Sequence, residues 1–481
     1  MSDSRMFVES CKSFHDRAVL AIAICAFVGS TGHAQEPRFE VPPVLEAASL
    51  LTPEVLRGEH HVVREAVAND GFMNTYTIDS DFGQFEAYGE PLLALRLREI
   101  GALAELDELS RTKVFAEALA KGAVSQVTTV VEFAGHPVET VKGVPEGVKR
   151  MFKRTVRTVK KGAEVAKDLA EDSDGSEDGE EGTGEDSEGK DGALKEGAEA
   201  GQKYAKKYFG VSGAERRWAE KLGVDPYTAN EVLRREIKKV AKVDAAGGLT
   251  VRLAPIPRIP GVSYIKDLSK LVWRTDPWEL REINRKALVA MGGDTELVEE
   301  FLGNAFFNPS AQTFLVSVLS DLPSVEGRSL VVGLAALAES QEEASFFIQA
   351  IKMLAGFKGS GVQITELLGG GRLPGVLTGD ARLVLLIPVD HIFWTEGIAA
   401  AADGPFAQVG KDLSIMSREL WFRGRVSERC RKELGARGWL VRDQVRFTAP
   451  ASDAEQDSES NADPDLDPSL HETRESNSRA D

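Results

Sequence analysis

The chain has 481 residues, which is enough for about three domains with their own cores. Its formal net charge is −18, and two segments carry the whole acidic excess: residues 171–191 hold eleven acidic residues and one Lys, and residues 450–481 hold ten acidic residues and two Arg. The positive and negative charges of the remaining sequence balance. The net charge of the whole chain therefore says little about the charge of the folded surface.

The N-terminal segment has the pattern of a secretory signal peptide. Arg17 precedes an apolar run from Ala18 to Val28, and small and polar residues follow up to Ala34. The run has about eleven residues, whereas a membrane-spanning helix needs about twenty. Ile24 precedes Cys25, where a lipoprotein signal requires a small residue. Residues 1–34 are therefore predicted to be a cleaved signal peptide without a lipid anchor, and the protein is expected to be periplasmic or secreted.

Removal of this segment takes away Cys11 and Cys25 and leaves Cys430. A single thiol cannot form an intrachain disulfide, so the mature chain must be held together by its hydrophobic core. No other apolar run approaches membrane-spanning length. The mature protein is expected to be soluble or peripheral, without a transmembrane span.

Residues 35–170 predict an N-terminal domain with a β-meander followed by helices. Turn-forming residues at 69–71 and 79–83 separate three strand-length stretches, and the stretch after the first turn alternates with a period of two residues. Pro91 opens a helix with leucines at helical spacing, and a second helix follows through Phe115.

Two neighbouring histidines, His60 and His61, lie at the start of the meander beside Glu59 and Glu65. Imidazole and carboxylate groups together can bind zinc. Adjacent residues of a strand point to opposite faces, however, and the sequence has no HExxH motif that would complete a site. The acidic segments lack the correctly placed glycine of a calcium-binding loop. We predict no metal ion and no cofactor.

The segment "VKRMFKRTVRTVKK", which begins at Val148, predicts a strongly amphipathic helix at the end of the N-terminal domain. Apolar residues fall on one face, among them Phe152, Val156 and Val159. Seven basic residues fall on the opposite face and are the candidate contact with an anionic surface: Lys149, Arg150, Lys153, Arg154, Arg157, Lys160 and Lys161.

Residues 171–200 are predicted to be a disordered acidic linker and residues 449–481 a disordered acidic tail. Both segments contain few apolar residues and many Ser, Asp and Glu, so they cannot bury enough area to offset chain entropy. Their carboxylates are expected to bind cations weakly and without specificity.

Two interpretations of the basic helix compete. It can lie on an anionic membrane, where each surface Lys or Arg contributes about 1 kcal/mol. Alternatively, its apolar face packs in the protein core while the acidic linker, which is close in sequence, approaches the basic face within a Debye length and screens it. We prefer internal screening, and then membrane or partner binding. Nucleic acid is not expected as a partner, because interleaved aromatic residues are missing.

Residues 201–275 are predicted to hold two helices divided at Gly223 and Pro226, followed by an extended connector, "APIPRIPG" (254–261), with three prolines. Residues 276–358 are predicted to be a helical bundle. Capping signals at Asp276 and Ser340 mark the starts of two of its helices. The helices of this bundle are expected at about 277–291, 295–303, 309–322, 326–339 and 341–357.

Residues 359–448 predict a small α/β unit, which makes the expected fold class mainly α with small β elements (α+β). A hairpin is expected to turn at 378–380 before a buried strand at 383–389. Ser427 is expected to cap a helix that contains Cys430 as a buried structural thiol, and the chain extends again over 439–445. The glycine-rich stretch 367–375 lacks the GxxxxGK[ST] pattern of a phosphate-binding loop.

Four stretches carry a resemblance to known sequences: "YTIDSDFGQFEAYGE", "HPVETVKGVPEGVKRMFKR", "KLGVDPYT" and "WFRGRVSERCRKELGARGWLV". They resemble an uncharacterised family of exported proteobacterial proteins and are spread over most of the folded chain. This resemblance implies export. It implies no catalytic residues, because the family has no assigned activity.

No catalytic signature appears in the mature sequence. We therefore expect an exported, non-enzymatic envelope protein that binds a protein partner or a membrane surface. The alternative is an exported hydrolase whose site is assembled from distant residues, for example His61 or His391 with neighbouring carboxylates.

Overall fold

The computed structural model describes residues 38–121, 204–247, 249, 270–370, 372–409 and 414–447. Its helices and strands belong to one unit, Pro42–Asp481, and they confirm the mixed α and β class expected from the sequence. In these ranges no helix is long and apolar enough to cross a membrane. The predicted signal peptide, basic helix, acidic linker, proline-rich connector and acidic tail lie outside the described residues.

The N-terminal sheet is built around β4 (Asn74–Ser80). β2 (His61–Val63) and β3 (Ala66–Asn69) lie end to end along one edge of β4, and β5 (Gly83–Tyr88) lies along the other edge, all antiparallel to it. Alternate residues of β4 are buried, so one face of the sheet belongs to the core. Three short elements precede β2: β1 (Leu45–Glu46), which pairs with β3, α2 (Ala47–Leu50) and α3 (Pro53–Leu56).

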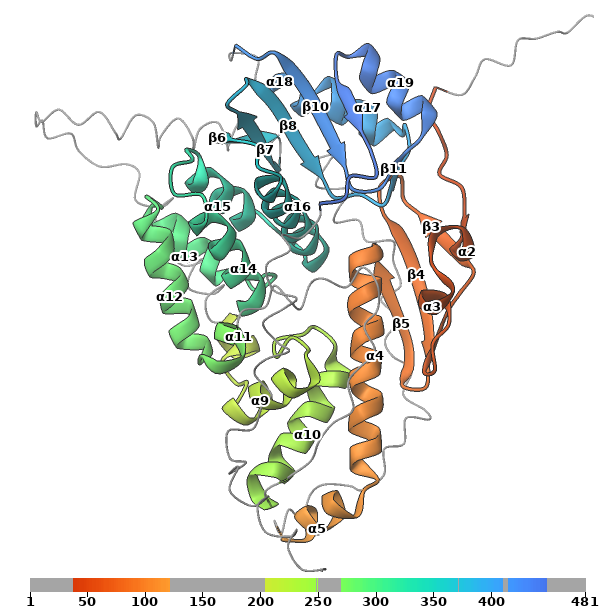
Figure 1. Cartoon of the computed structure of the whole chain (residues 1–481), viewed down its shortest axis with the longest axis vertical. Coiled ribbons are helices and arrows are strands. Elements are labelled where there is room, and N and C mark those ends of the chain that lie inside the picture. Colours follow the sequence, from red (N-terminus) through yellow and green to blue (C-terminus); the bar gives the residue numbers. More distant parts are fainter. Residues whose placement is uncertain are drawn as a thin grey trace, which may run out of the picture. The chain divides into compact units, whose positions relative to one another are not determined.

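A long helix, α4 (Glu90–Ser110), packs on β4 and β5 and contributes to the first hydrophobic core. Leu97 of α4, Trp218 and Ile237 are all buried in this core. Gly223 adopts a left-handed conformation with φ of 62° and ends the helix that contains Trp218. Three helices join α4 around this core (Figure 1): α5 (Lys113–Lys121), α9 (Gly213–Leu222) and α10 (Glu231–Gly247).

The central helices begin where local signals place them. The side chains of Asp276, Asn308 and Ser340 each accept a hydrogen bond from a backbone N–H of the following first turn. Four of the five expected helices start at the predicted residue, and α15 starts two residues later, after Gly327. The helices are α11 (Lys270–Arg274), α12 (Pro277–Ala290), α13 (Thr295–Gly303), α14 (Pro309–Ser320), α15 (Arg328–Ala336) and α16 (Gln341–Gly359).

The C-terminal sheet has the strand order β12-β10-β8-β7-β6. β6 (Ile364–Gly370), β7 (Leu373–Thr378) and β8 (Arg382–Ile387) are antiparallel neighbours. β10 (Ser417–Phe422) and β12 (Leu440–Arg442) extend the sheet in parallel with β8. Along the chain, α17 (Glu396–Asp403) and α18 (Pro405–Gln408) lie between β8 and β10, and α19 (Glu428–Ala436) lies between β10 and β12. The short strand β9 (His391–Ile392) follows β8, β11 (Arg425–Val426) follows β10, and these two short strands pair in parallel.

Several local predictions for this region are confirmed. The hairpin turns between Thr378 and Arg382, Ser427 caps α19, and Cys430 is buried. The last strand, β12 (Leu440–Arg442), is shorter than the predicted range 439–445, and within that range Gln444 leaves the extended region with a positive φ of 52°.

A second hydrophobic core joins the central helices to the C-terminal sheet. Phe301 and Ile351 are fully buried beside Leu367 of β6 and Val384 of β8 in one continuous cluster. In Figure 1, α16 lies alongside the sheet formed by β7, β8 and β10. The helices 276–358 and the strands after residue 359 therefore share their packing.

Candidate functional site

The structure describes three of the seven histidines of the sequence, and their environments differ. His60 Nδ1 lies 2.8 Å from Asp81 Oδ2 near the surface. His61 Nε2 lies 3.1 Å from a backbone carbonyl oxygen of α3, and burial lowers the pKa of His61. His391, in β9, stacks on Phe393 with the ring centroids 4.2 Å apart. Within the described ranges no cluster of His, Cys, Asp and Glu has the arrangement of a metal site.

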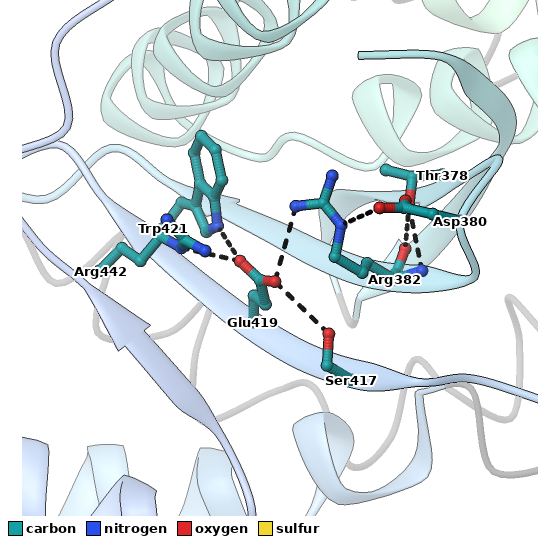
Figure 2. Close-up of polar contacts among 7 residues, drawn as sticks. All are labelled: Thr378, Asp380, Arg382, Ser417, Glu419, Trp421 and Arg442. Carbon is teal, nitrogen blue, oxygen red and sulfur yellow. Dashed lines mark hydrogen bonds and ion pairs between the residues drawn. The ribbon is translucent and has the colours of Figure 1, made fainter.

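A buried carboxylate, Glu419, lies at the centre of a polar cluster on the C-terminal sheet (Figure 2). Its Oε2 accepts hydrogen bonds from Trp421 Nε1 at 2.8 Å and from Arg442 Nε at 2.9 Å. Its Oε1 lies 3.6 Å from Arg382 Nη1 and accepts a hydrogen bond from Ser417 Oγ at 3.4 Å. The carboxylate thus contacts two guanidinium groups from the strands on either side.

Strand register explains how these residues meet. Ser417, Glu419 and Trp421 alternate along β10 and therefore share one face of the sheet. The parallel pairing places Ser417 opposite Arg382 on β8 and Trp421 opposite Arg442 on β12. Residues that pair across neighbouring strands point to the same face, so both arginines reach the Glu419 carboxylate.

The hairpin between β7 and β8 fixes the Arg382 side of this cluster. Arg382 Nε donates to Asp380 Oδ2 at 2.8 Å, and Thr378 Oγ1 donates to Asp380 Oδ1 at 2.5 Å. The backbone N–H of Arg382 donates in turn to Thr378 Oγ1 at 3.0 Å. Arg382 therefore bridges the turn and Glu419, as Figure 2 shows.

The electrostatics of the cluster hold Glu419 in its charged form. Burial raises the pKa of Glu419, but the Trp421 hydrogen bond and the charges of Arg442 and Arg382 outweigh burial, so the pKa lies below its usual value. A carboxylate that is ionised and already saturated with donors is a poor proton acceptor at neutral pH. Glu419 therefore links β8, β10 and β12 through its contacts with Arg382 and Arg442, and its environment is unlike that of a catalytic acid or base.

A second buried carboxylate, Asp390, lies just beyond the carboxyl end of β8. Asp390 accepts hydrogen bonds from the backbone N–H of Asn74 at 3.1 Å and of Glu90 at 3.3 Å, and from the guanidinium of Arg423. Gly89, the N-cap residue of α4, has no side chain that could accept these hydrogen bonds. A carboxylate that is 300 residues away in sequence therefore caps α4 at the positive end of the helix dipole.

The backbone around Asp390 makes further contacts with the N-terminal sheet. The N–H groups of Asp390 and His391 donate to Phe72 O at 3.1 and 3.2 Å, and Phe393 N–H donates to Gly71 O at 3.1 Å. The space beyond the carboxyl ends of parallel strands is where open α/β sheets usually bind ligands. Here the turn between β3 and β4 and the first residues of α4 occupy that position.

The predicted anionic contact, Lys149 to Lys161, lies outside the described residues, but α10 shows a comparable pattern. Leu233, Ile237 and Val240 of α10 are buried in the first core. The opposite side carries a row of exposed basic residues, which we call the α10 basic row: Arg235, Lys238 and Lys242. In this helix the apolar side packs in the core and the basic side faces solvent.

Sequence reasoning did not identify the residues at the centres of these polar clusters. If 417–422 is read as a strand, the two-residue period of side chains places Glu419 on the same face as Ser417 and Trp421, although polar and apolar residues do not alternate in this stretch. No local signal could have shown that Arg442 reaches Glu419, because the strand order of the C-terminal sheet decides it, or that Asp390 reaches Asn74, because that contact joins two different sheets. No family model matches the chain, and neither does any curated protein or any solved structure.

Proposed function

We propose that this protein is an exported, non-enzymatic envelope protein that binds an anionic surface or a protein partner through its basic residues. The α10 basic row carries the proposal, because Arg235, Lys238 and Lys242 form one exposed line on a helix whose other side is buried. The buried carboxyl groups of Glu419 and Asp390 have partners within the chain, which supports a structural role for them.

The burial of the apolar side of α10 determines the kind of contact. A helix that inserts into a membrane interface must expose its apolar face, whereas Leu233 and Ile237 are in the core. Contact through the α10 basic row would therefore be electrostatic and sensitive to salt, with about 1 kcal/mol from each basic residue near the surface. The seven basic residues between Lys149 and Lys161 are proposed to add to the same surface charge.

The wider organisation is part of the same proposal. Residues 1–34 serve as an export signal, and the N-terminal meander with its helices is followed by a central group of helices that shares its core with the C-terminal α/β unit. The acidic segment 171–191, with a net charge of −10, competes with external anions for the basic residues. Its deletion is therefore expected to strengthen binding.

Sedimentation with phosphatidylserine-containing vesicles at low and high salt tests this function on the mature full-length protein. We expect binding that decreases with salt and increases when residues 171–191 are deleted. Replacement of Arg235, Lys238 and Lys242 by Gln should weaken binding by up to about 3 kcal/mol.

A charge-matched control removes three exposed lysines from separate elements, Lys206, Lys286 and Lys432. If both triple variants lose the same amount of binding, then net charge alone is responsible and the α10 basic row has no special role. If neither the wild-type protein nor the deletion variant binds vesicles even at low salt, the membrane version of the function is wrong.

A further inference from the structure

One side of α12 carries four partly or fully exposed residues with the spacing of a coiled-coil seam. They follow each other at intervals of four, three and four residues, and we call them the α12 seam: Trp278, Glu282, Arg285 and Val289. Trp278 is 60% exposed and Val289 is 41% exposed. The residues that α12 buries, among them Leu280 and Leu288, lie on another side of the helix.

The α12 seam is self-complementary about the midpoint of the helix, which has 14 residues. Glu282 and Arg285 lie at equal distances from this midpoint, one on each side. Trp278 and Val289 do the same further out. A second α12 that runs antiparallel across the midpoint therefore places an acid opposite a base at the centre, and an aliphatic side chain opposite an indole at each end.

The order of the charges selects the antiparallel arrangement. In a parallel pair of helices each seam residue meets its own copy, so Glu282 would face Glu282 and Arg285 would face Arg285. Like charges in contact repel each other and oppose association. In the antiparallel pair the charges that face each other have opposite signs. Such a pair has two-fold symmetry, which is the commonest symmetry of protein dimers.

The charged centre of the seam is already ordered within one chain. Arg285 Nε and Nη2 donate hydrogen bonds to the Glu282 carboxylate at 2.8 and 2.9 Å. Because the two side chains hold each other, little of their freedom is lost on association. The pair uses two of the five N–H groups of the guanidinium, and the others can donate to the carboxylate of a second copy.

The indole at one end of the seam is also held in place. Its ring centroid lies 3.8 Å from that of Phe209, with 34° between the ring planes. The N–H of Trp278 donates to Asp276 Oδ1 at 3.0 Å in the cap of α12. An ordered and exposed indole is typical of the residues that supply binding energy, whereas charges mainly determine the alignment of the partners.

We propose that the α12 seam binds the α12 seam of a second copy of this chain and forms an antiparallel, two-fold symmetric dimer. A helix of 14 residues is about 21 Å long, so the contact lies at the low end of protein interface sizes. We expect a dissociation constant on the order of 10–100 μM. This association goes beyond the proposed function, because the seam contains none of the α10 basic row.

Sedimentation equilibrium of the mature full-length protein tests the dimer through two charge reversals. Glu282→Arg and Arg285→Glu each place like charges opposite one another across the axis, so each should raise the dissociation constant at least about tenfold. An equimolar mixture of these two variants should associate with the affinity of the wild-type protein, because every base again faces an acid. The double variant Glu282→Arg/Arg285→Glu should likewise dimerise on its own.

Recovery on mixing separates the dimer from effects within one chain. The Glu282–Arg285 pair of a single chain is lost in both variants and stays lost in the mixture, so only contact between two copies can restore association. The matched control for charge is Arg111→Glu, which reverses an exposed arginine that pairs with Asp107 one turn away on α4. It should leave the dissociation constant unchanged.

The apolar ends of the seam have their own test. Trp278→Ala should raise the dissociation constant about tenfold, and Val289→Ala about threefold. Ile283→Ala is the matched control, because it removes a side chain of similar exposure, 37%, from the same helix but outside the seam. Ile283→Ala should have no effect on association.

A wild-type protein that stays monomeric up to about 0.5 mM would overturn the proposal, since the expected dissociation constant lies well below this concentration. A mixture of the two charge-reversal variants that stays monomeric would also overturn it. Equal losses for Val289→Ala and Ile283→Ala would show that association does not use the seam. Vesicle binding is measured separately, so failure of the dimer leaves the proposed function unaffected.

Discussion

At the scale of single residues, the Glu419 cluster shows how charge can be buried without an acid–base role. Glu419 is 2% exposed, whereas Arg382 and Arg442 are 24% and 55% exposed at their side chains. The carboxylate is desolvated, and its two cationic partners retain part of their hydration. Their hydrogen bonds to an ionised acceptor offset the cost of burying the charge.

This balance predicts the effect of Glu419→Gln. The amide keeps the size of the side chain but removes the charge that both guanidinium groups contact, so the free energy of unfolding at pH 7 should fall by about 2 kcal/mol. Urea unfolding followed by circular dichroism measures the loss. The exposed strand residue Glu86 provides the control, because Glu86→Gln should change stability by less than about 0.5 kcal/mol.

The pH dependence of the same variant gives a second check. The folded-state pKa of Glu419 is lowered, so its stabilisation is fully present above the unfolded pKa of about 4.3 and is lost as pH falls through the folded value. The difference between wild-type protein and Glu419→Gln should therefore shrink below about pH 4. A difference that stays constant from pH 7 down to pH 3 would show that Glu419 stabilises the sheet without its charge.

At the scale of elements, helix starts could be predicted because their causes are local. Asp276 and Ser340 each bond to an N–H two or three residues later, so the signal and its effect lie within one turn. Ser427 caps α19 in the same way through the N–H of Cys430. The start of α4 differs, because its capping carboxylate comes from Asp390, and no sequence window contains both.

The contact between parallel strand ends likewise depends on distant residues. Gly424, just after β10, lies so close to Asp390 that a Cβ atom at this position would be 1.9 Å from the backbone oxygen of Asp390. The N–H of Arg425 donates to the same oxygen at 2.9 Å. The glycine is therefore needed for close approach of two backbones, which the sequence alone does not show.

Gly424→Ala tests this close approach. The added methyl group would force the backbone of Asp390 away and weaken the cap on α4, so we expect a loss of about 3 kcal/mol or more in unfolding free energy. Gly435, in α19, has open space around the same position and is the matched control. Gly435→Ala should stabilise the protein by about 0.5 kcal/mol through helix propensity. Similar thermal midpoints for the two variants would contradict the proposed contact.

At the scale of the whole molecule, the loop between α9 and α10 links the two hydrophobic cores. Glu99 of α4, which is fully buried, accepts hydrogen bonds from Thr228 and from Asn230 at 3.0 Å. A few residues earlier in this loop, Asp225 accepts hydrogen bonds from Ser310 Oγ at 2.6 Å and from Asn308 Nδ2 at 2.8 Å at the start of α14.

These partners lie from 83 to 131 residues apart in sequence, which explains why the division at Gly223 and Pro226 could be predicted but its role could not. Turn-forming residues such as Gly and Pro predict a break between helices, because their own backbone preferences cause it. The choice of α4 and α14 as neighbours follows from packing of the complete chain. The polar side chains of the loop are satisfied only after that packing is in place.

Asp225 predicts how this link responds to pH. Burial raises the pKa of Asp225, against the hydrogen bonds from Ser310, Tyr227 and Asn308, and the nearby charge of Glu99 raises it further. Because the folded pKa lies above the unfolded value of about 3.9, the contribution of the bound proton to stability is fully present below about pH 4. It is lost as pH rises through the folded pKa, by up to about 1.4 kcal/mol for each pH unit.

Asp225→Asn removes this ionisation while keeping a side chain that accepts the Ser310 hydrogen bond. At pH 4.5 the variant should be about 1 kcal/mol less stable than the wild-type protein, because the amide pairs imperfectly with Asn308. As pH rises to 8 the wild-type protein alone bears the cost of ionising a buried carboxyl group, so the difference should narrow and then reverse. Urea unfolding at both pH values measures it, with the exposed Asp321→Asn as control. If the stability advantage of the wild-type protein over Asp225→Asn instead grows toward pH 8, then ionised Asp225 stabilises the fold. The link between the two cores would then depend on the negative charge of Asp225.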